Sequence, residues 1–151
     1  MKAVIQRVSR ASVCVDSNVI GAIEKGFLIL LGVENGDDET EAKVLASKIS
    51  GLRVFCDDND KMNFSLSDIS GSVLVISNFT LCGNCKKGRR PSFDGAARPE
   101  TALPLYKYFC DCLRKEGIIK VEEGEFGADM KVDLLNDGPV TLIIDSKELS
   151  R

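Results

Sequence analysis

The chain has 151 residues, of which 44% are hydrophobic and 28% are charged, and its formal net charge is −3. This length predicts one domain over residues 1–151, and the composition is that of a folded globular protein, which excludes wholesale disorder. The longest apolar run, residues 27–33, is far shorter than the roughly 20 residues of a membrane-spanning helix. Gln6 and Arg7 interrupt the apolar core that a signal peptide would need. We therefore expect a cytoplasmic protein that does not bind membranes.

The first part of the chain predicts strands. Residues 2–8 and 11–16 alternate apolar and polar side chains, as strands with one buried face do, and residues 19–23 follow after a short turn. Residues 26–33 are continuously apolar, which indicates a central strand that is buried on both faces.

A helix, a strand and a loop are expected next. Asp38 is of the residue type that begins helices, and apolar residues follow it at helical spacing, giving a buried stripe of Ala42, Leu45, Ile49 and Leu52. Residues 72–79 are rich in β-branched side chains and predict another core strand. Residues 83–98 are rich in Gly, Lys and Arg and predict a loop.

The last part of the chain predicts a second helix and further strands. The helix is expected over residues 101–115, with Pro104 in its first turn, Gly117 as its end, and an inward face formed by Leu105, Phe109 and Leu113. Strands are expected at residues 118–121, 128–135 and 140–145. Hairpins combined with two helices predict an α+β fold, in which a mostly antiparallel, curved, β-barrel-like sheet carries the helices.

The sequence contains no histidine and no tryptophan. Without histidine, Ser-His-Asp and Cys-His catalysis within one chain are excluded, and so are histidine-containing metal sites. Any enzyme of this sequence must use backbone groups, hydroxyls, carboxylates, lysines, cysteines or groups of its own substrate.

Six cysteines leave a metal or redox protein as one alternative. Four of them form a Cys-x-x-Cys pair and a Cys-x-Cys pair, the members being Cys82, Cys85, Cys110 and Cys112. On a helix, however, the two thiols of Cys-x-Cys point about 200° apart. We therefore expect structural cysteines and neither a metal ion nor another cofactor.

The positive charges gather in one segment. Between residues 86 and 98 five cations face only Asp94, which gives a local net charge of +4 on an otherwise acidic chain; four of them are Lys86, Lys87, Arg89 and Arg90. A short basic loop on an acidic protein suits a local contact with phosphates and does not suit the wrapping of a DNA duplex.

Two segments combine a strand end with polar, backbone-exposing residues. Residues 77–81, Ser-Asn-Phe-Thr-Leu, offer two hydroxyls, an amide and backbone N–H groups that can meet a carbonyl. Residues 136–141, Asn-Asp-Gly-Pro-Val-Thr, contain Gly138 and Pro139, which can bring bare carbonyls close to a ligand. Each segment is also compatible with an ordinary turn.

These two segments resemble the motifs of the D-aminoacyl-tRNA deacylases, also called D-tyrosyl-tRNA deacylases. Residues 77–81 are similar to the family's Ser-Gln-Phe-Thr-Leu, with Asn78 in place of Gln, and residues 136–141 match Asn-x-Gly-Pro-Val-Thr completely. The resemblance extends over essentially the whole chain through residues 5–8, 10–13, 30–33, 61–63, 90–93 and 126–130.

The resemblance implies a homodimer that hydrolyses the ester between a D-amino acid and the acceptor end of tRNA, and that also removes glycine mischarged onto tRNA-Ala. It implies a cis Gly138–Pro139 peptide that enters the partner's active site as the chirality filter. The scissile carbonyl is expected beside Thr80 and the segment Ser77, Asn78 and Phe79. The amino-acid pocket is expected from Phe126, Met130, Val140 and Thr141, with Arg7 bracing the Gly-Pro loop.

The resemblance and the missing histidine favour catalysis by the RNA substrate itself. An aminoacyl ester is already activated, so two contributions are expected to suffice for its hydrolysis. Backbone N–H groups near Phe79 and Thr80 would stabilise the oxyanion, and the 2′-hydroxyl of the terminal adenosine would orient the water. Thr80 as a covalent nucleophile is the alternative, but it has no evident base. Because Asn78 is one methylene shorter than Gln, its side chain reaches less far toward the oxyanion, so a bridging water or the backbone N–H would have to take any hydrogen-bonding role of the family Gln.

One alternative of another class remains besides a metal protein. A dimeric module could bind tRNA through the basic segment from Lys86 to Arg98 and catalyse nothing. Such a module would bind charged and uncharged tRNA alike and would leave the ester intact.

Overall fold

The computed structural model describes residues 1–149. Its main sheet has the strand order β2-β1-β3-β6-β7, and β8 pairs with the other edge of β1. The strands are β1 (Lys2–Val15), β2 (Asn18–Ile23), β3 (Gly26–Gly32), β6 (Ser72–Ser77), β7 (Val121–Glu123) and β8 (Lys131–Asp145). A separate hairpin consists of β4 (Phe55–Cys56) and β5 (Met62–Phe64).

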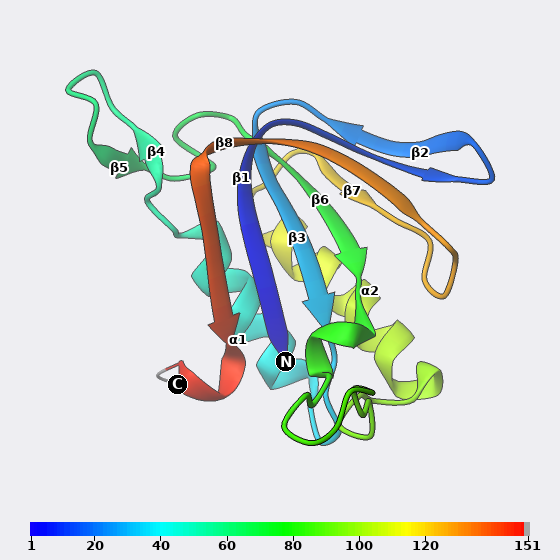
Figure 1. The fold of residues 1–151 in the computed structure, drawn as a ribbon. Coiled ribbons are helices and arrows are strands. Elements are labelled where there is room, and N and C mark those ends of the chain that lie inside the picture. Colours follow the sequence, from blue (N-terminus) through cyan, green and yellow to red (C-terminus); the bar gives the residue numbers. More distant parts are fainter. Residues whose placement is uncertain (150–151) are drawn as a thin grey trace.

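The long strand β1 organises the sheet. Its first half pairs antiparallel with β3, its second half pairs antiparallel with β2, and β8 runs antiparallel along almost its whole length. Only β3–β6 and β6–β7 are parallel. The sheet bends where β1 passes from β3 to β2, which produces the curved, barrel-like shape in Figure 1.

Two helices, α1 (Glu39–Ser50) and α2 (Pro99–Lys115), cover one face of the sheet, and they lie behind it in Figure 1. The larger core fills the space between the sheet and these helices, and it includes Phe27, Ile29 and Leu31 of β3. Leu28 points to the other face, into a smaller core within the bend. Strand β3 is therefore buried on both faces, and the predicted α+β fold with a mostly antiparallel, barrel-like sheet and two helices is confirmed.

The first helix agrees with the sequence. Asp38 is its N-cap, and its carboxylate accepts a hydrogen bond from the Thr40 N–H at 2.7 Å. Ala42, Leu45 and Ile49 are fully buried. The prediction was wrong for Leu52, which lies beyond the helix C-cap and is half-buried.

The second helix begins earlier than predicted. The helix starts at Pro99, and proline suits the first helical position because the N–H group that it lacks would have no partner within the helix there. As expected, the helix ends before Gly117, which has φ +92°. Pro104 is therefore in the helix interior and not in the first turn. The expected inward residues Leu105, Phe109 and Leu113 are buried.

Several predicted strand boundaries were wrong, and the strand expected at residues 118–121 begins only at its last residue, as β7 (Val121–Glu123). Residues 2–8 and 11–16 form the single strand β1, and residues 128–135 and 140–145 belong to the single strand β8, because β1 and β8 pair through their bends with register shifts. Strand β6 ends at Ser77, where a 3-10 turn, η1 (Phe79–Cys82), begins. Neither helix of the described residues is long and apolar enough to cross a membrane.

Candidate active site

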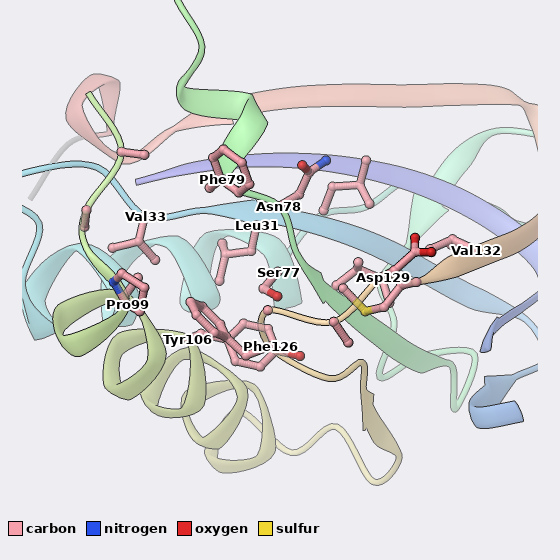
Figure 2. A pocket seen from close by; sticks show the side chains of 18 residues that line it. Leu31, Val33, Ser77, Asn78, Phe79, Pro99, Tyr106, Phe126, Asp129 and Val132 are labelled. Atoms are coloured by element: carbon pink, nitrogen blue, oxygen red, sulfur yellow. The ribbon is translucent and has the colours of Figure 1, made fainter. Parts of the chain in front are cut away.

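A cavity of about 620 Å³ opens where β3 and β6 end, between the sheet and α2. Figure 2 shows Ser77 and Leu31 above the aromatic wall that Tyr106 and Phe126 form. The lining is mostly apolar and comes from the strand ends, the start of α2 and the segment before β8: Leu30, Leu31, Val33, Ile76, Ser77, Asn78, Phe79, Ala96, Ala97, Pro99, Ala102, Tyr106, Phe126, Gly127, Ala128, Asp129, Met130 and Val132.

The backbone turns sharply at the polar rim of the cavity. The Asn78 N–H donates to the Leu31 carbonyl at 2.8 Å, as the last bond between β6 and β3. The Leu81 N–H then donates to the Asn78 carbonyl at 3.3 Å and closes the first 3-10 turn. The N–H groups of Phe79 and Thr80 come before this first turn bond, so the turn itself does not use them.

Gly32 permits this turn to pack against β3. A Cβ atom on Gly32 would lie 3.0 Å from the Leu81 Cβ and 3.1 Å from the Asn78 carbonyl oxygen. A larger residue would therefore push the turn away from the strand end. The position of the Phe79 and Thr80 backbone thus depends on a glycine in the neighbouring strand.

The structure brings the four predicted catalytic residues together, and three of them line the cavity. Ser77, Asn78 and Phe79 line the cavity, and the exposed Thr80 lies beside it, with its hydroxyl donating to the side-chain oxygen of Asn78. An amide oxygen is not a base that can activate a hydroxyl nucleophile. The short side chain of Asn78 is therefore engaged within the turn.

The wall of the cavity includes two predicted residues and one that the sequence analysis missed. Phe126 and Met130 line it as expected, and the ring of Tyr106 lies 6.1 Å from the ring of Phe126. The Tyr106 hydroxyl donates to the Val75 carbonyl at 2.8 Å, and burial raises the pKa of Tyr106 far above its ordinary value. Tyr106 is 1% exposed and lies next to the inward stripe of α2, so its only signal in the sequence was that of a core residue.

Val140, Thr141 and Arg7 do not line this cavity, and neither do Gly138 and Pro139. The Gly138–Pro139 peptide is cis, as expected, and it lies in β8 between Asn136 and Thr141, where the register with β1 shifts. The strand register places it near the opposite end of β3 and β6, because Ser77 lies level with Leu31 and Ala3, whereas Arg7 lies level with Phe27 and Val73. The separation is four residues along β1, or about 13 Å at the usual rise of a strand.

Hydrogen bonds hold the Gly138–Pro139 loop firmly. The Arg7 Nε donates to the Asp137 carbonyl at 2.8 Å. The Asn136 side chain accepts from the Val140 N–H at 2.8 Å and donates to the Val140 carbonyl and the Thr141 hydroxyl, both at 3.1 Å. A Cβ on Gly138 would lie 2.6 Å from the Val140 nitrogen, and φ of +152° also favours glycine there.

The basic loop begins directly after the 3-10 turn. Paired backbone bonds between Asn84 and Ser92, at 2.7 and 3.0 Å, close its base. The rings of Phe79 and Phe93 meet edge to face at 5.2 Å and remain 59% and 38% exposed. The loop's four predicted phosphate contacts, Lys86, Lys87, Arg89 and Arg90, are all exposed.

The cysteines do not converge. Cys82, Cys110 and Cys112 are buried at separate places, and Cys85 is exposed in the basic loop. Burial raises the pKa of the Cys110 thiol to about 12. Within residues 1–149, no group of three or more Cys, Asp or Glu side chains is placed to hold a metal ion.

Known proteins resemble the chain over its whole length. Residues 4–145 match the family described as D-Tyr-tRNA(Tyr) deacylase. The D-aminoacyl-tRNA deacylase of Thermosipho melanesiensis is 56% identical over 149 residues, covering 99% of each chain, and that of Geotalea daltonii is 59% identical over 146 residues, covering 97% of each.

Solved structures share the fold. One described as c-Myc DNA Unwinding Element Binding Protein has a TM-score of 0.91 and 41% identity, covering 96% of this chain and 98% of its own. A probable eukaryotic D-amino acid tRNA deacylase has a TM-score of 0.79 at 15% identity, over 95% and 97% of the two chains, and indicates the fold alone. The chain therefore belongs to the D-Tyr-tRNA(Tyr) deacylase family, whose members are hydrolases of ester bonds.

Proposed function

We propose that this protein hydrolyses the ester of D-aminoacyl-tRNA to a free D-amino acid and tRNA, rejects L-aminoacyl-tRNA, and removes glycine mischarged onto tRNA-Ala. The observation that carries this proposal is the apolar cavity whose polar rim is the turn from Ser77 to Thr80. Its size lies in the usual range for a small-molecule site, about 300–1,000 Å³, and suits an aminoacylated adenosine. Aromatic walls such as Tyr106 and Phe126 suit a nucleobase.

The backbone of the turn supplies the main catalytic contribution. The N–H groups of Phe79 and Thr80 lie ahead of the first turn bond and can donate to the oxyanion that forms when water attacks the ester. One preorganised donor of this kind is worth about 3–4 kcal/mol, or roughly 10²–10³ in rate. The 2′-hydroxyl of the terminal adenosine orients the water, so the RNA assists its own hydrolysis.

Thr80 orients the turn and does not attack the ester. Its hydroxyl donates to the Asn78 side chain, and this contact fixes both side chains at the rim. No carboxylate or amine within residues 1–149 is hydrogen-bonded to the Thr80 hydroxyl. Asn78 contributes through its backbone carbonyl, which accepts the Leu81 N–H, so the shorter side chain is compatible with activity.

The active site is completed by a second copy of the chain. Gly138 and Pro139 lie about 13 Å along the sheet from the cavity of their own chain, by strand rise, so they reach a cavity only in a partner. Strand β8 pairs only with β1 among the described residues, and it exposes Leu135 by 50% and Ile143 by 80%. An edge strand with one free edge and exposed apolar side chains suits the interface of a symmetric homodimer.

The Gly138–Pro139 loop acts as the chirality filter. The two enantiomers carry identical groups, so discrimination has to occur at Cα. Rigid backbone carbonyls that hold the α-ammonium leave no space for a side chain on the L side, whereas glycine carries only hydrogen there. Such a filter does not read the side chain and accepts many D-residues.

The tRNA approaches along the basic loop. Lys86, Lys87, Arg89 and Arg90 bind backbone phosphates near the acceptor end, which positions the RNA without reading its sequence. The exposed rings of Phe79 and Phe93 offer apolar contact to unpaired bases beside the cavity. This substrate makes the cytoplasm the place of action.

The first experiment compares the hydrolysis of D-Tyr-tRNA and L-Tyr-tRNA by the purified protein in the presence of EDTA. Rapid loss of the D-ester alone is expected, and it would also dispose of an obligatory exchangeable metal ion. If both esters stay intact while tRNA binds, the protein is a tRNA-binding module and the proposal fails.

The variant Thr80→Ala separates the two catalytic roles. A positioning role predicts a reduced but measurable rate on D-Tyr-tRNA, with unchanged tRNA binding. Complete loss of hydrolysis with unchanged binding would instead make Thr80 the nucleophile. Thr80→Ser keeps a hydroxyl as the matched control and should retain most of the rate.

A further inference from the structure

The buried guanidinium of Arg7 joins two segments that are far apart in the sequence. Arg7 is 8% exposed, and besides its bond to the Asp137 carbonyl it donates from Nη1 to the Val54 carbonyl at 2.6 Å. Within residues 1–149 these two backbone carbonyls are its only oxygen acceptors. The place of the Asp137 carbonyl, next to Gly138, therefore depends on the place of the Val54 carbonyl.

Val54 stands at the base of the β4–β5 hairpin, which the core fixes on one side. Phe55 is 1% exposed, and its ring stacks on that of Phe27 at 5.0 Å. Phe27 in turn lies opposite Arg7 in the β1–β3 register. The residue after Val54 is thus anchored on Phe27, the strand residue that pairs with Arg7.

The residue before Val54 is fixed by the other arm of the hairpin. The Arg53 Nε donates to the Asn63 carbonyl at 2.8 Å, and a second guanidinium nitrogen donates to the Asn63 side-chain oxygen. A planar guanidinium that donates to two oxygens of one residue holds that residue more rigidly than a single hydrogen bond does. The peptide between Arg53 and Val54 is consequently held at both ends.

We propose that Arg53 and Asn63 are positioning residues for the chirality filter. They fix the Val54 carbonyl, which orients Arg7, which holds Asp137 and thereby the Gly138–Pro139 loop. This inference rests on the proposed function of that loop. The two side chains belong to a hairpin that contributes nothing to the cavity lining, so their effect is on the geometry of the loop that the partner receives.

The test measures hydrolysis of D-Tyr-tRNA and L-Tyr-tRNA by Arg53→Ala and by Asn63→Ala. Because small displacements of a positioned group change rates strongly, we expect the ratio of the D rate to the L rate to fall about tenfold in each variant. Arg53 is exposed, so its loss leaves the core intact, and Arg53→Lys, which keeps the charge but not the paired donors, should show the same direction. The matched control is Arg10→Ala, which removes an exposed arginine paired with Asp133 and should leave the ratio unchanged.

A double-mutant cycle tests the route through Arg7. If Arg53 acts through Arg7, then Arg53→Ala should change the ratio much less in an Arg7→Lys background than in the wild type. Unchanged ratios in both single variants, or fully additive effects in the cycle, overturn the inference. A wild-type protein that leaves the D-ester intact would instead overturn the proposed function, so the two failures are distinguishable.

Discussion

The two ends of β3 and β6 present opposite surfaces. At the end of β6 the chain forms a mostly apolar cavity, whose polar lining comes from the turn that begins at Ser77 and from Asp129. At the bend of β8 the chain projects a loop, and two side chains, Arg7 and Asn136, donate hydrogen bonds to its carbonyls. One end is therefore shaped to receive a ligand, and the other is shaped to stay rigid.

Under the proposed function, this difference accounts for a division of labour in which each chain supplies two half-sites, a cavity and a filter loop, and the partner completes both. A cavity needs space beside reactive backbone groups, whereas a chirality filter needs carbonyls that do not move. Both demands are met in the same small sheet because they are met at different ends. In a symmetric dimer each end of one chain would meet the other end of its partner, which gives two equivalent sites.

The largest effect is expected from Gly138→Ala. The new Cβ would collide with the Val140 nitrogen at 2.6 Å and its Cγ2 at 2.8 Å, so the filter loop has to move. The rate on D-Tyr-tRNA should fall by about 100-fold or more, measured in single-turnover hydrolysis. Gly36→Ala is the control, because Gly36 also has a positive φ, +87°, but has nothing within 4 Å of the added Cβ. Equal rates for the two variants would contradict a filter role for the loop.

Mixing two inactive variants should restore activity. Ala97→Phe fills the cavity, and Gly138→Ala displaces the filter, so each homodimer lacks both sites. After subunit exchange, half of the dimers are mixed and each holds one intact site, which predicts recovery to about a quarter of the wild-type rate. Each variant refolded alone provides the baseline. Absence of recovery from a mixture that contains mixed dimers would place both halves of the site in one chain.

The basic loop can be tested through salt. The variant replaces four residues by Gln: Lys86, Lys87, Arg89 and Arg90. Its tRNA binding should be roughly tenfold weaker at low salt. The slope of the logarithm of the binding constant against the logarithm of the salt concentration should become shallower by about 0.7–0.9 for each lost phosphate contact. Lys43→Gln removes an exposed lysine of α1 and serves as the control. Wild-type binding that does not respond to salt would exclude the phosphate contact. Titration of binding at several salt concentrations measures both quantities.

The smallest effect concerns the link between α2 and β7 beside the cavity. Glu123 accepts hydrogen bonds from Lys107 at 2.8 Å and from Arg114 at 2.7 Å. Burial raises the pKa of the Glu123 carboxyl, but these two hydrogen bonds outweigh the effect of burial and bring the pKa below its ordinary value of 4.5. The ionised form therefore stabilises the fold at neutral pH, and this contribution is lost as the pH falls through the folded-state pKa.

Glu123→Gln should lower the free energy of unfolding at pH 7 by up to about 1 kcal/mol, because the pair is partly exposed. The difference from the wild type should shrink as the pH falls below 4.5, in denaturant titrations at several pH values. Glu24→Gln at an exposed turn is the control. A difference that persists at low pH would mean that the variant acts through packing and not through charge.

The sequence predicted those elements whose signal is local. Asp38 was identified as the start of α1 from the residue type and the apolar spacing that follows it, and β3 was identified from an unbroken apolar run. The end of α2 was predicted and its start was not, because Pro99, and not Pro104, is the proline of the first turn. The continuity of β1 and β8 depends on their mutual pairing, which no local pattern contains.

The candidate site divides in the same way. The two motifs at residues 77–81 and 136–141 were identified from their sequence alone, and the cis peptide followed from the family resemblance. Tyr106 was missed because a buried tyrosine in an amphipathic helix looks like any core residue. The distance between the motifs was also unpredictable, because it comes from the register of β1 with β3 and β8.

That register has a consequence for how the protein can vary. Between the level of Ala3 and the level of Arg7, β1 sets the spacing of the two half-sites by its number of residues. A single inserted or deleted residue there would shift the halves by about 3.3 Å and turn every following side chain to the opposite face. The turn after β1 is free of this constraint, since Asp16 and Ser17 lie beyond both half-sites. Length changes should therefore be tolerated at the turn, whereas the first half of β1 can change its residues but not their number.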